Sequence, residues 1–291
     1  MNYSGMYKRF KILLFISLFL TVALSVLGSY SDLGAMGTVS AASTSDSANI
    51  TVKVYKWKKF DTGADIRKTK EFKIYNKKGL LTQQLFNRKE KGKTKIGLAS
   101  KGTVVFKFQK GEGPKTIVIA GTHGDEYASQ AAALKLLNFL DKNRKKIKGT
   151  VYVIPISNPK ATVKKSRTYF GYDPNRVVGK KSSFTGHIMV NIILKEKIKY
   201  VGDFHTMVGG TTLIYAAPYS KSKKISKTIA NKLNHNYKIS PNKGTITRTS
   251  AEHGLVSFTG EVQSKRGAIS PGRDKLSYKQ MICFLRIAKN I

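Results

Sequence analysis

Two histidines and two glutamates in this chain have the residue types and the spacing of a catalytic zinc site. His123 and Glu126 form a His-x-x-Glu pair, His205 lies far downstream of it, and Glu261 follows later still. Zinc favours imidazole nitrogen and carboxylate oxygen, and a set of two histidines and one glutamate leaves a fourth position for water, which the metal acidifies. A nearby buried carboxylate can take the proton of that water. The pattern therefore predicts one Zn²⁺ per chain, bound by His123, Glu126 and His205.

The segments around these residues must place them at the ends of strands. Residues 116–121 form an apolar, β-branched run that ends in glycine, and apolar residues recur at helical spacing from about 126 to 140. Residues 198–205 and 257–262 have the composition of two further strands. In open α/β sheets, ligands gather beyond the carboxyl ends of the strands. We therefore expect His123 on a loop, Glu126 on the first turn of a helix and His205 at the end of a strand.

Further motifs occur in an order that resembles a known family. The chain is similar to the zinc carboxypeptidase superfamily, and most similar to its succinylglutamate desuccinylase/aspartoacylase branch. The motifs lie between residues 101 and 262, over half of the chain. They are Gly121–Glu126, Asn158–Ala161, Arg167, Asp173–Arg176, Asp203–His205 and Gly260–Val262.

The resemblance implies both a fold and a set of roles. The fold would be α/β, with a mixed, largely parallel central sheet and helices on both faces. Alternating segments between residues 50 and 110 add an N-terminal β extension. The implied roles are zinc ligation by His123, Glu126 and His205, general base and later general acid for Glu261, polarisation of the scissile carbonyl by Arg167, and binding of a substrate carboxylate by Asn175 and Arg176.

The chain departs from the family pattern in three ways that bear on these implied roles. Pro174 stands where the family has leucine, which fixes one φ angle and removes one N–H donor. About 30 residues follow Glu261, too few for the second, β-rich domain of aspartoacylases, so we expect a more open cleft. The tyrosine that closes over the substrate in this family has no convincing motif here. Tyr215, Tyr219 and Tyr237 are its candidates.

Several other residues have two readings. Asp125 and Asp203 either orient a histidine or serve as ordinary carboxylates of a helix start and a strand. Arg248 either favours an acidic substrate side chain or is one solvated cation among many. The remaining histidines, His187, His235 and His253, lack ligand spacing, and Cys283, the single cysteine, lies in the apolar pattern of a helix near residues 276–288.

The amino terminus predicts export. Lys8, Arg9 and Lys11 precede an uncharged apolar stretch from Ile12, and small residues follow at 39–42. The uncharged stretch continues to Ser31, so an uncleaved membrane anchor is the alternative. Either version places the rest of the chain outside the cytoplasm. We divide the chain into a leader or anchor at 1–42, a linker and β extension at 43–100, and a catalytic domain at 101–291.

The second unusual property is a formal charge of +37, of which +35 remains without residues 1–42. For an exported protein, the accessible polyanions are lipid headgroups and acidic envelope polymers. A general lysine bias that only solvates the surface explains the charge equally well. Export, an even spread of lysines and the lack of a recognisable motif argue against nucleic-acid binding. The oligomeric state is not readable from the sequence.

Three functions follow from these observations. The leading one is an exported zinc-dependent hydrolase of an amide bond next to a carboxylate-bearing residue, which would be a carboxypeptidase or an envelope peptide amidohydrolase. The alternative is an N-acyl amino acid deacylase. The third is a non-catalytic, cationic envelope-binding protein, which gives no chemical reason to retain all four residues of the zinc pattern.

Overall fold

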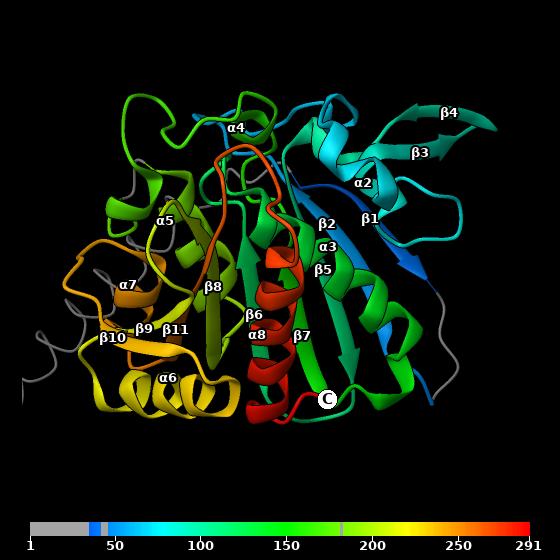
Figure 1. Ribbon diagram of the computed structural model, residues 1–291. Helices are drawn as coiled ribbons and strands as arrows, with labels where there is room; N and C mark the ends of the chain where they lie inside the picture. Colours follow the sequence, from blue (N-terminus) through cyan, green and yellow to red (C-terminus); the bar gives the residue numbers. More distant parts are fainter. Residues whose placement is uncertain (1–34, 42–45, 181–182) are drawn as a thin grey trace, which may run out of the picture. The chain divides into compact units, whose positions relative to one another are not determined.

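A mixed sheet organises the chain in the computed structural model, which describes residues 35–41, 46–180 and 183–291 (Figure 1). Its four inner strands, β7, β6, β8 and β11, are parallel, and the pairings outside them are antiparallel except that of β9 with β10. In spatial order the nine strands are β1 (Ala35–Ala41), β2 (Asn49–Tyr55), β5 (Thr103–Lys110), β7 (Gly149–Ile154), β6 (Lys115–Ala120), β8 (Tyr200–Met207), β11 (Val256–Gln263), β9 (Leu213–Ala216) and β10 (Asn236–Ile239).

The inner strands are buried along nearly their whole length. All of β7 is buried, as is all of β6 after Lys115. Both are rich in valine and isoleucine, which is the composition of parallel strands covered on both faces. The prediction of an α/β fold with a mixed, largely parallel centre is confirmed.

Helices cover both faces of this sheet. Phe204 of β8 and Phe258 of β11 pack against Phe284 of a helix on one face. Alternate side chains of the same strands point to the other face, where the Thr259 hydroxyl meets that of Thr247. The first face carries α3 (Tyr127–Lys142), α6 (Ser220–Leu233) and α8 (Arg273–Ile287), and the second carries α7 (Ile246–Glu252), with α5 (Phe184–Ile188) and the π-helical η6 (Met189–Leu194) beside it.

Shorter elements connect these layers. Strand β2, from the predicted N-terminal extension, pairs with β5 from the predicted catalytic domain, so both regions contribute to one sheet. A separate hairpin of β3 (Asn87–Glu90) and β4 (Lys93–Ile96) extends from the extension (Figure 1). The remaining elements are η1 (Ile66–Lys68), η2 (Lys70–Tyr75), α2 (Gln83–Phe86), η3 (Leu98–Lys101), η4 (Arg144–Lys146), α4 (Pro159–Val163) and η5 (Pro174–Arg176).

Most of the predicted leader lies outside the described residues, including the apolar stretch from Ile12 to Ser31. Its last part, Ala35–Ala41, is strand β1, which pairs with β2. No helix in the described ranges is long and apolar enough to cross a membrane.

Candidate metal and active site

The loop between β6 and α3 presents the first two predicted ligands. Gly121 ends the strand at φ +73°, a left-handed conformation that few other residues adopt without strain. Gly124 lies against α4, where a Cβ atom would be 2.0 Å from the carbonyl carbon of Ala161. The side-chain amide of Gln130, one turn into α3, donates to the carbonyls of His123 at 3.3 Å and Gly124 at 3.2 Å. Close packing and these bonds fix the loop, so His123 has a defined position.

Strands β8 and β11 bring His205 and Glu261 together. The parallel register pairs Glu261 directly with His205, so both side chains point to the same face of the sheet. Strand β8 continues two residues past His205 to Met207, whereas the sequence pattern suggested an end at the histidine. The backbone N–H of Thr206, inside this extension, donates to Glu126 Oε2 at 3.0 Å. The extra residues therefore tie the strand to the helix start.

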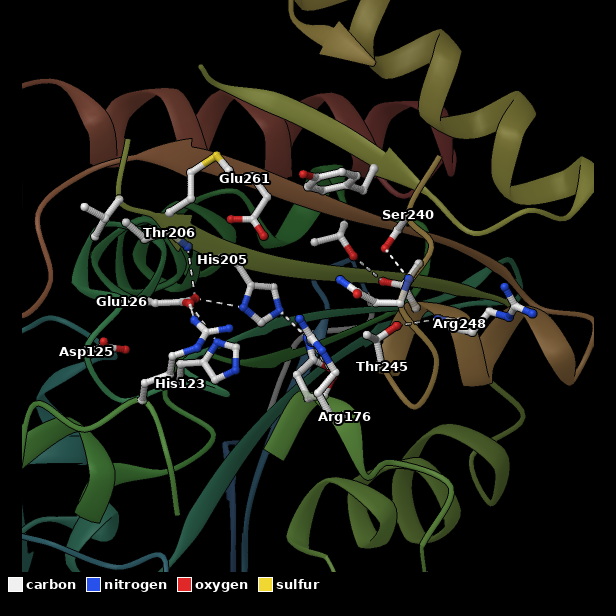
Figure 2. Close-up of a pocket in the computed structure, with 18 of the residues that line it drawn as sticks. His123, Asp125, Glu126, Arg176, His205, Thr206, Ser240, Thr245, Arg248 and Glu261 are labelled. Atoms are coloured by element: carbon white, nitrogen blue, oxygen red, sulfur yellow. Dashed lines mark hydrogen bonds and ion pairs between the residues drawn. The ribbon is translucent and has the colours of Figure 1, made fainter. Parts of the chain in front are cut away.

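Glu126 lies between the two histidines (Figure 2). Its Oε1 is 2.7 Å from Nδ1 of His123, and its Oε2 is 2.8 Å from Nδ1 of His205. One ligand atom from each of the three residues lies within 4.8 Å of the other two, and all three side chains are buried. The structure thus brings the three predicted ligands to one point.

A carboxylate lies at the far nitrogen of each imidazole. Asp173 Oδ1 is 2.8 Å from Nε2 of His123, and Asp203 Oδ2 is 2.8 Å from Nε2 of His205. Such a partner accepts a hydrogen bond from Nε2–H, which keeps the proton on Nε2 and leaves Nδ1 free to bind a metal. Strand alternation gave a signal for Asp203, but nothing in the sequence linked Asp173 to His123 across 50 residues. Asp125 does not take this role, because its carboxylate lies 3.5 Å from Nε of Arg266.

Burial and neighbouring charges set the protonation of these groups. Burial opposes ionisation of Glu126, but His123 and His205 hold its pKa well below its usual range. Burial also opposes a charged His205, but Asp203 and Glu126 raise its pKa well above the ordinary value. Glu261 differs, because burial raises its pKa to about 7. Its Oε2 is buried and has no hydrogen-bond partner among the described residues.

These residues fit a zinc ion. The donors are two imidazole nitrogens and one carboxylate, which zinc prefers, and each histidine has the supporting carboxylate usual at metal sites. The carboxylate of Glu126 is held in its anionic form, as a ligand must be. The unpartnered oxygen of Glu261 lies beside this cluster and is free to bond a water molecule.

The arginine and asparagine of the predicted site are also at this point. Arg167 donates to Glu126 Oε1 at 2.9 Å and to Asp173 Oδ2 at 3.2 Å. The short helix η5 accommodates Pro174 at its first position, where no backbone N–H is needed, and the Asp173 carboxylate caps it by accepting from the backbone N–H of Asn175 at 2.9 Å.

Asn175 and Arg176, neighbours in η5, differ in how many hydrogen-bond donors they leave free for a substrate. The side-chain N–H of Asn175 donates to Asp203 Oδ2 at 3.3 Å, and its oxygen accepts from the N–H of Ile246 at 2.9 Å. Both ends of this amide are therefore engaged within the protein. Arg176 donates from one nitrogen to the carbonyl of Asn175 at 2.8 Å and otherwise lines the pocket. Of the pair expected to bind a carboxylate, the arginine has the free donors.

The cluster opens into a cavity of about 520 Å³. Glu261 lies on one side of His205 in Figure 2 and His123 on the other, while Arg176 lies near His205 and Arg248 lies farther away, beyond Thr245. Hydroxyl groups of Ser240, Thr245, Thr247, Thr259 and Tyr215 line the same cavity. The pocket is polar and bears cationic side chains from separate elements.

The three tyrosines that are candidates for closing over the substrate differ in their position relative to the pocket. Tyr215 lines the pocket, and its pKa is raised by burial and by the charge of Glu261. Tyr219 lies outside the lining residues and stacks on the guanidinium of Arg248, 5.2 Å from its ring centre. Tyr237 lies under the ammonium of Lys227. The structure therefore brings only Tyr215 of these three to the pocket wall.

Residues 112–273 match the family model described as succinylglutamate desuccinylase/aspartoacylase catalytic domain. The earlier resemblance is confirmed by this match. No curated protein matches the chain.

Solved structures also resemble the chain. One is a succinylglutamate desuccinylase/aspartoacylase from Rhodobacter sphaeroides, at 21% identity over 65% of this chain and 59% of that one, with a TM-score of 0.55. Another is an aspartoacylase family protein from Mesorhizobium loti, at 16% identity over 88% and 71%, with a TM-score of 0.55. A third is a metallo-carboxypeptidase from Burkholderia cenocepacia, at 13% identity over 64% and 60%, with a TM-score of 0.53. At these identities the similarity shows a shared fold.

Proposed function

Because the chain belongs to the succinylglutamate desuccinylase/aspartoacylase catalytic-domain family, we propose that it is a zinc-dependent hydrolase of an amide bond next to a carboxylate-bearing residue. One observation carries this proposal. His123, Glu126 and His205 converge on one point, and the unpaired carboxylate of Glu261 stands beside them at the pocket wall. This is the arrangement that hydrolysis by an activated water requires.

Zinc held by His123, Glu126 and His205 supplies Lewis acidity, which lowers the pKa of water and polarises a carbonyl group. Glu261 takes a proton from the attacking water and later gives it to the leaving amine. In the metal-free protein burial raises the pKa of Glu261 to about 7, and a zinc ion beside it would lower that pKa and favour the carboxylate that acts as the base. Asp173 and Asp203 keep the two imidazole rings oriented and hold the protons on Nε2.

Arg167 stabilises the negative charge that develops on the scissile carbonyl oxygen. Its guanidinium is permanently charged and is fixed at the cluster by Glu126 and Asp173. Arg176 binds the substrate carboxylate, because guanidinium can bond both carboxylate oxygens at once. Arg248 also lines the pocket, and its Nε is paired with Glu252 at 2.8 Å, so the remaining guanidinium nitrogens are the ones that would favour a substrate with a further acidic group.

Two substrate classes are compatible with this site. The family match favours an N-acyl amino acid, as the names of the similar proteins suggest. Export would instead favour envelope peptides, because a role in cytoplasmic amino-acid catabolism would then be excluded.

We propose an extracytoplasmic location for the protein, on the strength of residues 8–42. We also propose that its charge retains it on anionic envelope polymers or lipid headgroups, and retention that is unchanged between low and high salt would contradict this.

Metal content and turnover of the purified protein test the proposal together. The protein should bind one zinc ion and hydrolyse at least one member of a panel of N-acyl amino acids and wall-type peptides. Glu261→Gln should bind zinc equally well and lose turnover. The preferred panel member then decides between deacylase and peptidase. Folded protein that binds no added zinc and turns over no substrate would favour the non-catalytic, envelope-binding alternative.

A further inference from the structure

A second cavity, of about 620 Å³, lies on the helical face of the sheet between α3, α6 and α8. Its volume is within the range of sites for small ligands. The apolar part of its lining packs against the hydrophobic core but stays partly open to water, with only the thiol of Cys283 largely covered. We call this cavity the helical groove, and its apolar residues are Phe139, Leu233, Tyr278, Ile282, Cys283 and Ile287.

The helical groove is separate from the candidate active site. Helix α3 starts at Tyr127, directly after Glu126, and Phe139 lies about 20 Å from this end along the helix at 1.5 Å per residue. Leu233 and Ile287 are the last residues of α6 and α8. Helices α3 and α6 contribute their carboxyl-terminal parts and α8 contributes residues 278–287, so a ligand there leaves the polar pocket free.

The polar part of the groove is entirely cationic. It consists of Lys232, Lys279 and Arg286. None of the three forms an ion pair with an acidic residue in the described part of the chain. The nearest acidic side chains of α3 and α8 are already paired, Asp141 with Arg144 and Asp274 with Lys135.

These charges act on the floor of the groove. Lys232 and Arg286 line the same groove as Cys283, and they oppose the rise in the pKa of its thiol that burial causes. Interactions with the helix dipole account for cations in the last turns of α6 and α8. They do not account for Lys279, which lies earlier in α8, or for the open apolar floor. An apolar channel with three unpaired cations is complementary to an amphiphile with an anionic head.

We propose that the helical groove binds an acyl chain of an anionic membrane phospholipid, with the headgroup phosphate at Lys232, Lys279 and Arg286. Lysine and arginine are the usual protein partners of phosphate, and an alkyl chain would cover the apolar floor. The ligand thus recognised is a lipid at a membrane surface. This proposal is independent of the hydrolase function, because it uses none of its residues.

Cys283 gives a direct reporter, since it is the single cysteine of the chain and lies in the groove. The full-length protein is mixed with vesicles of phosphatidylglycerol or of phosphatidylcholine, and alkylation of the thiol by uncharged N-ethylmaleimide is timed. At lipid concentrations about ten times the dissociation constant, phosphatidylglycerol should slow alkylation about tenfold by mass action. Phosphatidylcholine should leave the rate unchanged.

Two matched variants separate the groove from the overall charge. Lys279→Gln with Arg286→Gln removes two groove cations, and Lys93→Gln with Lys95→Gln removes two exposed cations of strand β4. The variant without the two groove cations should lose the protection of Cys283 by phosphatidylglycerol. The β4 variant has the same net charge and should keep that protection. Ile282→Glu, which places an acid on the groove floor, should also abolish protection. Melting temperature and metal content verify that each variant folds.

Three results would overturn the proposal. Equal protection by both lipids would show that the anionic head is not recognised. An equal loss of Cys283 protection in the two double variants would show that the protection depends only on the net charge of the protein. Sedimentation with phosphatidylglycerol vesicles without any protection of Cys283 would place the membrane contact elsewhere on the protein.

Discussion

Asp203 Oδ2 lies 2.8 Å from Nε2 of His205, on the opposite side of the ring from Glu126. The carboxylate thereby determines which nitrogen of His205 carries the proton, and it does so from two residues away on the same strand. Asp173 stands in the same relation to His123 but comes from a different part of the chain. Two carboxylates outside the predicted ligand set therefore orient the two imidazole rings.

Asp203→Asn should weaken zinc binding about 10- to 100-fold, the usual cost of removing such a partner. The amide is similar in size but cannot accept the Nε2 proton with the strength of a carboxylate. Competition with a chromophoric chelator measures the zinc affinity. Asp125→Asn is the matched control, because Asp125 neighbours the ligands without touching either imidazole. An equal loss in both variants would assign the effect to net charge rather than to ring orientation.

Glu261→Gln should lower kcat by about 10²- to 10⁴-fold and leave the zinc affinity nearly unchanged, because general acid–base catalysis has that magnitude. The glutamine keeps the shape of the side chain but cannot carry the proton. Steady-state kinetics and metal analysis of the same preparation provide the test. A variant that loses metal along with activity would make Glu261 a ligand instead.

The stability of the metal-free protein should depend on pH through Glu261. Its pKa is raised from 4.5 to about 7 on folding, so the folded state holds a proton that the unfolded state releases in this range. The folded state therefore loses stability as the pH rises from about 5 to 8, by as much as about 3 kcal/mol. Glu261→Gln has no such group, so its advantage over the wild type should grow across that range. Urea denaturation in the presence of a chelator measures both proteins, and parallel pH profiles would contradict the assignment.

Gly124→Ala should destabilise the fold by about 3 kcal/mol, the upper part of the range for overpacking. The new methyl carbon would lie 2.0 Å from the Ala161 carbonyl carbon, and this backbone cannot rotate away. Displacement of the loop should also weaken zinc binding at His123. Gly179→Ala is the control, because its Cβ meets open space at an ordinary φ. Thermal melts of the two variants test the difference, and similar melting temperatures would refute it.

Arg176→Ala should raise KM about 10- to 100-fold, since hydrogen bonds to charged groups contribute about 1.5–3 kcal/mol. The effect on kcat should be small, because Arg176 is proposed to bind a part of the substrate that does not react. Arg176→Lys keeps the charge but not the forked geometry, and should recover only part of the affinity. Initial-rate kinetics on the preferred substrate separate KM from kcat. A fall in kcat alone would place Arg176 at the reacting carbonyl.

Local patterns predicted the inner strands and the main helices well. The apolar run ending at Gly121 is strand β6, and the helix expected from about residue 126 begins at Tyr127. The end of α6 is harder to predict from such patterns: the helix ends at Leu233, because Asn234 adopts a left-handed conformation and Tyr237 enters strand β10. That ending depends on pairing of β10 with β9, which is a tertiary contact.

The sequence predicted the site residues that belong to spaced motifs. It did not predict the contacts between side chains that only the folded chain brings together. The cluster of His123, Glu126 and His205 was expected. The support of His123 by Asp173 was not, because an apolar period carries no information on which carboxylate reaches a ring nitrogen. The engagement of both ends of the Asn175 amide within the protein was likewise invisible, since Ile246 approaches it only after α7 packs on β11.

The contact between Glu126 and His205 closes a loop of 79 residues. Contacts so distant in sequence form late, because the chain must first lose the entropy of a long loop. Neither the β6–α3 loop nor β8 can hold a metal ion with three ligands alone. A partly folded chain therefore chelates zinc poorly, and the ion would bind only once β8 has docked beside β6. Zinc binding during refolding would thus occur when β8 completes the sheet. The metal would stabilise the last long-range step of folding rather than the first.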